Sequence, residues 1–128
     1  LEKIDQFKNR KTHLCCRGPR KEYESHKAEA RALIERKILQ FNARYQFAYN
    51  KVSIKNQKSR WGSCSAHGNL NFNYKLAFLD EALVDYVVVH ELCHLKELNH
   101  SRRFWDLVAQ MIPDFEERRN ELMKKRFS

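Results

Sequence analysis

One stretch decides the fold: Asp80-Glu-Ala-Leu-Val-Asp-Tyr-Val-Val-Val-His90-Glu91-Leu-Cys-His94-Leu-Lys-Glu-Leu-Asn-His100-Ser-Arg-Arg-Phe-Trp105. Its apolar residues recur at spacings of three and four between Leu83 and Leu95, which predicts a helix from Asp80 through Leu98. Aspartate is a favoured N-cap residue because its side chain can accept a hydrogen bond from the first turn. A helix this apolar is buried on most sides, so the polar residues inside it need a chemical reason to be there.

The predicted helix contains the pattern H-E-x-x-H at His90, Glu91 and His94. Residues four apart lie on the same face of a helix, so both imidazole rings can point at one metal ion. Glu91 follows the first histidine directly, where its carboxylate can reach a water molecule on that metal. This arrangement is typical of zinc hydrolases, in which the two histidines bind Zn²⁺ and the glutamate is the general base.

A catalytic zinc site uses three protein ligands and keeps one open position. We favour His100 as the third ligand, because a turn at Asn99, which tolerates the left-handed backbone conformation, would fold it back onto the helix. The spacing H-E-x-x-H-x5-H equals that of the metzincin peptidases, although Glu97 stands where those have glycine. The alternative third ligands are Glu97, Glu116 and Glu117. A less favoured interpretation has no metal, with the histidines as ordinary core or surface residues.

The rest of the chain supplies further helices and a small sheet. Apolar residues at helical spacing predict one long helix over residues 21–49, ending near Asn50. Ser101 and Asp114 are suited to cap two C-terminal helices. Period-two alternation predicts three short strands, at residues 51–55, 60–65 and 69–74. The sequence therefore predicts an α+β fold with a three-stranded antiparallel sheet.

Length and composition indicate a single domain. The chain has 128 residues, of which 42% are hydrophobic. The Gly-Pro break at Gly18 suggests a basic N-terminal arm over residues 1–20, with a short helix around Ile4 to Phe7, and a folded domain over residues 21–128. No apolar run is long enough to cross a membrane, and no secretory signal pattern is present.

The cysteines and the charge suggest a compartment and a second partner. No C-x-x-C spacing occurs, so we interpret the thiols as free and expect a cytoplasmic protein. The four cysteines are Cys15, Cys16, Cys64 and Cys93. Residues 1–70 carry a net charge of +10, whereas residues 71–128 carry −1. A basic half of this kind is compatible with nucleic-acid binding, although a solvated basic surface is the simpler interpretation.

Four blocks carry a resemblance to a known family: Lys58–Cys64, Gly68–Asn73, Asp85–Leu95 and Asn99–Trp105. Together they closely resemble the YgjP-like family of metal-dependent hydrolases, which is related to the SprT-like and WLM metallopeptidases. The resemblance implies a minimal zincin-like fold. It also implies that His90, His94 and His100 bind zinc and that Glu91 is the general base.

The motif and the resemblance together predict a zinc metallopeptidase that cleaves peptide or protein substrates with a zinc-bound water activated by Glu91. The substrate is expected to add as a strand to an edge of the sheet, and we expect a monomer. Candidate substrate-binding residues are Arg60, Trp61, Gly62 and Ser63. Trp61 has a competing interpretation as a core aromatic residue. The alternative functions are a nucleic-acid-associated module with a structural zinc and a protease acting on DNA-bound proteins.

Overall fold

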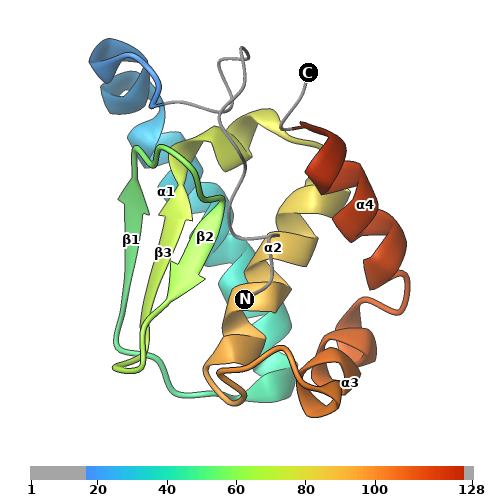
Figure 1. Ribbon diagram of the computed structural model, residues 1–128. Coiled ribbons are helices and arrows are strands. Elements are labelled where there is room, and N and C mark those ends of the chain that lie inside the picture. The colour runs from blue at the N-terminus through green and yellow to red at the C-terminus, as the bar shows by residue number, and fades with distance from the viewer. Residues whose placement is uncertain (1–16, 126–128) are drawn as a thin grey trace.

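A computed structural model describes residues 17–125 of the chain (Figure 1). Its elements are α1 (Arg20–Tyr45), β1 (Lys51–Lys55), β2 (Gly62–Cys64), β3 (Asn69–Asn73), the 3₁₀ helix η3 (Tyr74–Phe78), α2 (Glu81–His94), α3 (Arg102–Met111) and α4 (Phe115–Lys125). The predicted helix around Ile4 to Phe7 and the thiols of Cys15 and Cys16 lie outside the described residues.

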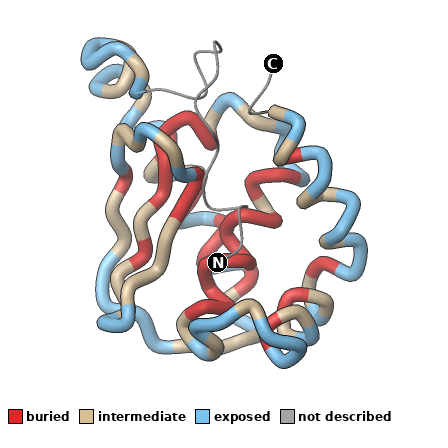
Figure 2. The backbone as a smooth tube through the Cα atoms, viewed as in Figure 1, coloured by how far each residue is buried: buried red, intermediate tan, exposed pale blue. Residues whose placement is uncertain are grey.

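Helix α2 lies at the centre of the molecule (Figure 1). It packs against α1, β2, α3 and α4, and α1 also packs against β1 and η3. Most of α2 is buried, whereas α4 is largely exposed (Figure 2). Within residues 17–125, no helix combines the length and the apolar character needed to cross a membrane. The mixed α+β architecture agrees with the fold class predicted from the sequence.

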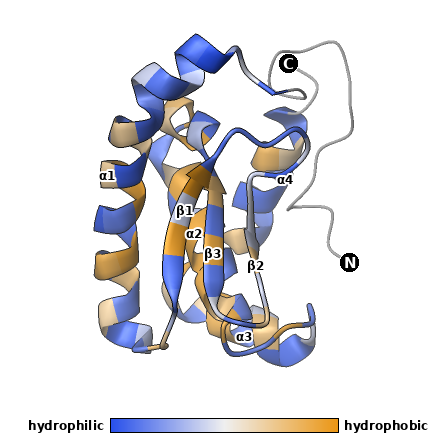
Figure 3. Cartoon of the chain, turned by 90° about the vertical axis from the view of Figure 1, so that its left-hand side faces the viewer, coloured by the Kyte–Doolittle hydropathy of each residue, from blue (hydrophilic) through white to orange (hydrophobic). Residues whose placement is uncertain are grey.

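Helix α1 is amphipathic and ends earlier than predicted. Hydrophobic and hydrophilic residues alternate along it (Figure 3), and its buried side includes Ile34, Ile38 and Phe41. The helix stops at Tyr45 because Gln46 adopts the left-handed conformation, with φ 59°, and its N–H donates to the carbonyl of a residue one turn back. The predicted extension to residue 49 is therefore wrong.

The sheet is mixed rather than antiparallel. Its strand order is β1-β3-β2, with β1 parallel to β3 and β2 antiparallel to β3, so that Ser63 lies opposite Asn71. The predicted meander is thus wrong in one pairing. The connection from β1 to β2 passes the carboxyl end of β3 instead of forming a hairpin. The buried side chain of Asn73 holds this connection by donating to the carbonyls of Gln57 (3.3 Å) and Arg60 (2.9 Å).

Helix α2 is shorter than its apolar pattern suggested. It begins at Glu81 and ends at His94, four residues before the predicted end at Leu98. Asp80 occupies the N-cap position, but its side chain makes no capping hydrogen bond. Eleven of the fourteen residues of α2 are buried, which explains why the polar side chains of its last turns are shielded from water.

Candidate metal centre

Three imidazole rings converge at the carboxyl end of α2. His90 and His94 come from the last two turns of this helix, and His100 comes from the loop before α3. The Nε2 atom of His100 lies 3.0 Å from that of His94 and 3.3 Å from that of His90. His90 is fully buried, His94 is 6% exposed and His100 is half-buried. We call these three residues the histidine cluster.

The geometry of the histidine cluster fits a divalent metal. Two nitrogen ligands of a tetrahedral zinc ion, each about 2.0–2.1 Å from it, lie about 3.3 Å apart. The separations of 3.0 and 3.3 Å within the cluster are close to that value. The Nδ1 atom of His94 lies 3.0 Å from the carbonyl of Glu97, which can only accept, so this nitrogen carries the ring proton and Nε2 keeps its lone pair.

The loop after α2 brings His100 back to the helix. Helix-like hydrogen bonds continue to Glu97, whose N–H donates to the carbonyl of Cys93 (2.9 Å), and the carbonyl of Glu97 then accepts from His94. The turn needs no left-handed residue, since in the described part of the chain Gln46 is the non-glycine residue with positive φ. The conformation predicted for Asn99 is therefore wrong, although the return of His100 that it was meant to explain does occur.

Two aromatic rings fix the orientation of the cluster. Ser101 caps α3 as predicted, since its Oγ accepts from the N–H of Phe104 (3.4 Å). Phe104 is fully buried, and its ring stacks on His94 with the ring centroids 4.4 Å apart. Trp105 stacks on His100 at 5.9 Å. The packing of this aromatic pair thus holds the loop that carries His100 against α2.

The surroundings keep two of the three imidazoles neutral. Burial, with a contribution from the charge of His90, lowers the pKa of His94 to about 4. Burial lowers the pKa of His100 to about 3, and the charges of His90, His94 and Arg119 act in the same direction. A neutral imidazole is the form that binds a metal, so His94 and His100 are in their binding state at neutral pH.

Glu91 is fully buried beside the cluster. Its Oε2 atom lies 3.2 Å from Nδ1 of His90. On another side it meets Gly62 of β2, where a Cβ atom would lie only 3.2 Å from Cγ of Glu91. The carboxylate therefore lies between the first histidine of the motif and the edge strand of the sheet.

The other predicted substrate-binding residues have different environments. Arg60 is exposed on the loop before β2. Trp61 is 2% exposed and belongs to the hydrophobic core, as its competing interpretation held. Ser63 is half-buried, and its Oγ accepts from the amide of Asn71 (3.3 Å). Gly62 lies directly against Glu91.

The alternative ligands lie elsewhere. Among the described residues, the group able to hold a metal consists of the three histidines and includes none of Glu97, Glu116 and Glu117. The last two are exposed on α4. Two tyrosines have other environments. The hydroxyl of Tyr74 donates to Glu22 at the start of α1 (2.5 Å). Tyr86 is buried, with its ring 5.7 Å from that of His90.

Two features near the centre were not predicted. Arg119 of α4 stacks over Trp105, with Cζ 5.2 Å from the ring centroid, and its charge reaches His100. The contact of Gly62 with Glu91 joins residues 29 positions apart. Neither has a signal in the local sequence pattern, because both depend on how distant elements pack.

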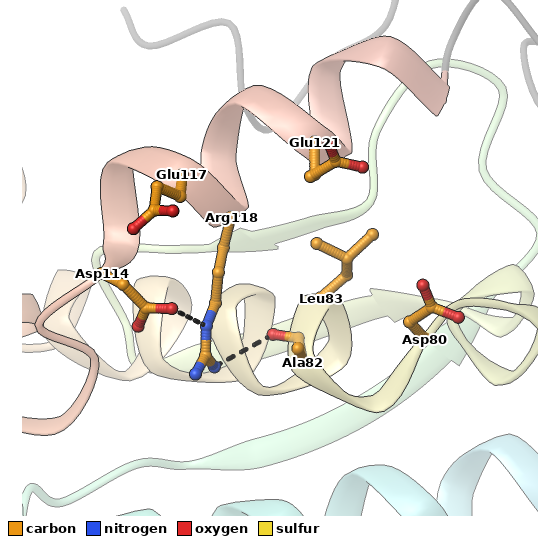
Figure 4. Close-up of a pocket in the computed structure, with 7 residues that line it drawn as sticks. All are labelled: Asp80, Ala82, Leu83, Asp114, Glu117, Arg118 and Glu121. Carbon is orange, nitrogen blue, oxygen red and sulfur yellow. Dashed lines mark hydrogen bonds and ion pairs between the residues drawn. The ribbon is translucent and has the colours of Figure 1, made fainter.

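A separate pocket lies between the start of α2 and α4 (Figure 4). Arg118 reaches across it, donating to Asp114 (3.2 Å) and to the carbonyl of Ala82 (3.2 Å). Ala82 precedes His94 by twelve residues, or about 18 Å of helix. The pocket therefore belongs to the packing of α4 on α2 and not to the histidine cluster.

Comparison with known proteins gives a consistent result. The model of the YgjP-like metallopeptidase domain matches residues 4–125. The crystal structure of the metallopeptidase zymogen of Pyrococcus abyssi abylysin superimposes with a TM-score of 0.57 and 25% identity, covering 75% of this chain and 90% of that one. The metallopeptidase zymogen of Methanocaldococcus jannaschii jannalysin has a similar fold, with a TM-score of 0.55 and 21% identity, covering 75% and 95%. None of the curated proteins matches the chain in sequence.

Proposed function

The chain belongs to the YgjP-like metallopeptidases, and from that premise we propose that its peptidase reaction takes place at the histidine cluster, with Glu91 as the general base. The observation that carries this proposal is the convergence of three Nε2 atoms beside a buried carboxylate. We further propose that the metal is Zn²⁺, because three imidazole ligands with a fourth position left open are typical of catalytic zinc.

Each group at the metal centre has its own role in the proposed reaction. A zinc ion bound there would act as a Lewis acid toward a peptide carbonyl and would make water more acidic. Glu91 would take the proton from the attacking water and pass it to the leaving amine. Phe104 and Trp105 hold the rings of His94 and His100 in place, which keeps the ligand set preorganised.

Strand β2 is the proposed edge for a peptide substrate. Just outside β2, the backbone of Trp61 and of Ser65 also bonds to that of Asn73 and Asn69, and Ser63 lies opposite Asn71 between them. In an antiparallel ladder the direction of the backbone groups alternates, so the N–H and C=O of Cys64 point away from β3. A peptide in extended conformation could pair at the half-buried Cys64, two residues from the buried contact of Gly62 with Glu91.

The test is metal analysis combined with hydrolysis of labelled casein by the wild type and by Glu91→Gln. We expect about one zinc per chain in both proteins, because Glu91 is not a ligand, and a loss of hydrolysis of about 10²–10⁴-fold in the variant. A chelator should abolish the wild-type activity and added Zn²⁺ should restore it. Full activity in Glu91→Gln, or a native protein that binds no metal, would contradict the proposal.

One observation favours nucleic acid as a second partner. Basic side chains gather where α1 begins and where β1 ends, around a hollow in which Glu24 pairs with Arg20 (3.0 Å). The hollow is lined by Arg17, Arg20, Tyr23, Glu24, Lys55, Asn56 and Gln57. Gly18 and Asn56 tie the two segments together through two hydrogen bonds of 2.9 Å. Phosphate groups are the expected occupants of such a surface.

The salt dependence of DNA binding tests this second partner. Affinity for a single-stranded oligonucleotide should fall as salt rises, and Lys55→Glu should weaken binding uniformly across sequences. Lys51→Glu is the matched control, because Lys51 is an exposed lysine at the opposite end of the same strand. No binding at low salt would eliminate the nucleic-acid partner and leave the peptidase proposal intact.

The division into an arm and a domain, and the monomeric state, also remain proposals. In support of the domain boundary, α1 begins at Arg20. In support of a reducing compartment, the buried Cys93 is a thiol outside any disulfide. Light scattering of the purified chain and of a form lacking residues 1–20 would measure both properties; loss of folding on removal of the arm would contradict the boundary.

A further inference from the structure

We propose that Gly62 is a positioning residue for Glu91: the absence of a side chain on β2 leaves the space in which the Glu91 carboxylate is held beside the histidine cluster. The inference rests on the proposed function, in which Glu91 is the general base. It assigns Gly62 an effect on the reaction through Glu91 rather than through contact with the substrate.

The space around Gly62 is tight for a methyl group, so an added Cβ atom would require its neighbours to shift by a few tenths of an ångström. A Cβ atom there would lie 3.2 Å from Cγ and 3.3 Å from Oε2 of Glu91, and 3.2 Å from the carbonyl oxygen of Asn71. Carbon atoms in favourable contact are about 3.5–4.0 Å apart. Gly62 and Glu91 are both buried, so neither side of this contact can relax into solvent.

The reason for glycine at this position is space and not backbone conformation. The contrast is with Gly68 in the turn before β3, which has φ +82° and is, among residues 17–125, the glycine with positive φ. The backbone of Gly62 is an ordinary strand residue opposite Phe72. Any residue could adopt that backbone, but a larger one would meet Glu91.

The backbones of Gly62 and Glu91 are both held in place by neighbouring elements. Strand β2 is fixed to β3 by a hydrogen bond at each end, from the N–H of Asn73 to the carbonyl of Trp61 (2.9 Å) and from the N–H of Ser65 to the carbonyl of Asn69 (3.0 Å). Glu91 is carried by a helix that is buried around most of its circumference. An added methyl group must therefore displace the one part that can rotate, which is the Glu91 side chain. Misplacement of a catalytic group by about 1 Å can cost about 10²-fold in rate.

The test is Gly62→Ala, assayed for hydrolysis of labelled casein, for Zn²⁺ affinity and for thermal midpoint. We expect kcat to fall about tenfold or more, because the carboxylate shifts by a fraction of an ångström. KM and Zn²⁺ affinity should stay within about twofold, because the histidine cluster is untouched. Unchanged kcat in Gly62→Ala would overturn the proposal.

Gly18→Ala is the matched control for steric damage. A Cβ atom on Gly18 would lie 1.7 Å from the hydroxyl oxygen of Tyr74, far outside any allowed contact, at the start of α1. This variant should lower the thermal midpoint while kcat per folded molecule stays at the wild-type value. A kcat loss in Gly18→Ala equal to that in Gly62→Ala would show a general effect of destabilisation and would overturn the positioning role.

A double variant keeps the inference testable without activity. In the Glu91→Ala background the Cγ and Oε2 atoms are gone and the contact with the Asn71 carbonyl remains, so adding Gly62→Ala should lower the thermal midpoint by about half as much as in the wild type, or less. If Gly62→Ala alone does not fold, the double variant should fold. Equal drops in both backgrounds, or an unfolded double variant, would overturn the proposal. If the wild type hydrolyses no substrate, the proposed function fails, but this thermal coupling is still measured.

Discussion

A polar cluster lies near each end of α2, and the two clusters are of different kinds. Near the amino end, the buried Lys37 of α1 contacts the exposed Glu81 and lies 2.9 Å from the partly buried Asp85, so one cation meets two carboxylates. We call these three residues the lysine cluster. Near the carboxyl end lies the histidine cluster, in which three imidazoles direct nitrogen atoms at one another.

The difference shows that charge balance, rather than burial, separates structural from functional polar groups. Burial alone would lower the pKa of Lys37, but hydrogen bonds to Glu81 and Asp85 and their charges outweigh it and raise that pKa. The lysine cluster is thus internally compensated. In the histidine cluster the Nε2 atom of His100 faces the Nε2 atoms of His94 and His90 at hydrogen-bond distance. A neutral imidazole has only one ring proton, so the three nitrogens cannot all be paired by hydrogen bonds among themselves. A cation bound between them would pair with all three lone pairs.

The largest expected effect follows from removing a member of the histidine cluster, and it is a loss of metal affinity. His100→Ala removes one of three proposed ligands, and Zn²⁺ affinity should fall by about 100-fold or more, since loss of even an outer-shell partner costs about 10–100-fold. Competition with a chromogenic chelator measures this affinity. The control is His67→Ala, because His67 is exposed on the turn before β3.

The same measurement distinguishes the alternative ligands. Glu97→Gln and Glu116→Gln should leave Zn²⁺ affinity within about twofold, because neither residue belongs to the cluster. A loss of Zn²⁺ affinity in Glu116→Gln with none in His100→Ala would identify Glu116 of α4 as the third ligand, and the contrast between the two ends of α2 would then be wrong.

The sequence predicted the histidine cluster and the three strands, but not the order in which the strands pair. Helical periodicity and the H-E-x-x-H spacing placed His90, Glu91 and His94 on one element, because both are local properties of the chain. His100 could also be predicted from the sequence, because only a short loop separates it from the helix. The parallel pairing of β1 could not be predicted, because alternation shows which side chains share a face of a strand but not which strands are neighbours in the sheet.

Long-range contacts were beyond the reach of sequence patterns for the same reason. Lys37 appeared as one more charge on a long helix, and nothing nearby indicated that it would be 3% exposed against α2. The contact of Gly62 with Glu91 likewise depends on the packing of β2 beside α2. Local chemistry identified the ligands, and only the fold identified what positions them.

A smaller effect is expected at the other end of α2. Lys37→Met should destabilise the protein by about 2 kcal/mol, because the partly buried carboxylate of Asp85 loses its positively charged partner. This loss is smaller than that expected for a fully buried ion pair, because Glu81 is exposed to water. Zn²⁺ affinity and kcat per folded molecule should not change. Urea unfolding measures the first quantity, and a drop in Zn²⁺ affinity would show that the two clusters are coupled along the helix.

The smallest effect separates the clusters by pH in the metal-free protein. The pKa of His94 is lowered to about 4 in the folded state and is about 6.5 in the unfolded state, so the unfolded chain binds more protons as pH falls. The stabilisation is therefore fully present above about pH 6.5 and is lost progressively toward pH 4, by about 1 kcal/mol from His94 alone between pH 7 and 5.5.

Lys37 stays charged throughout this range because its pKa is raised, so Lys37→Met should unfold at a lower temperature than the wild type at every pH, with the same dependence of the thermal midpoint on pH. Thermal midpoints of the chelated wild type and Lys37→Met across this range measure both slopes. Since bound metal competes with protons for the same nitrogens, added Zn²⁺ should raise the midpoint most at neutral pH. A flat profile in the metal-free wild type would mean that the imidazoles are not kept neutral by the fold, and the distinction between the two clusters would fail.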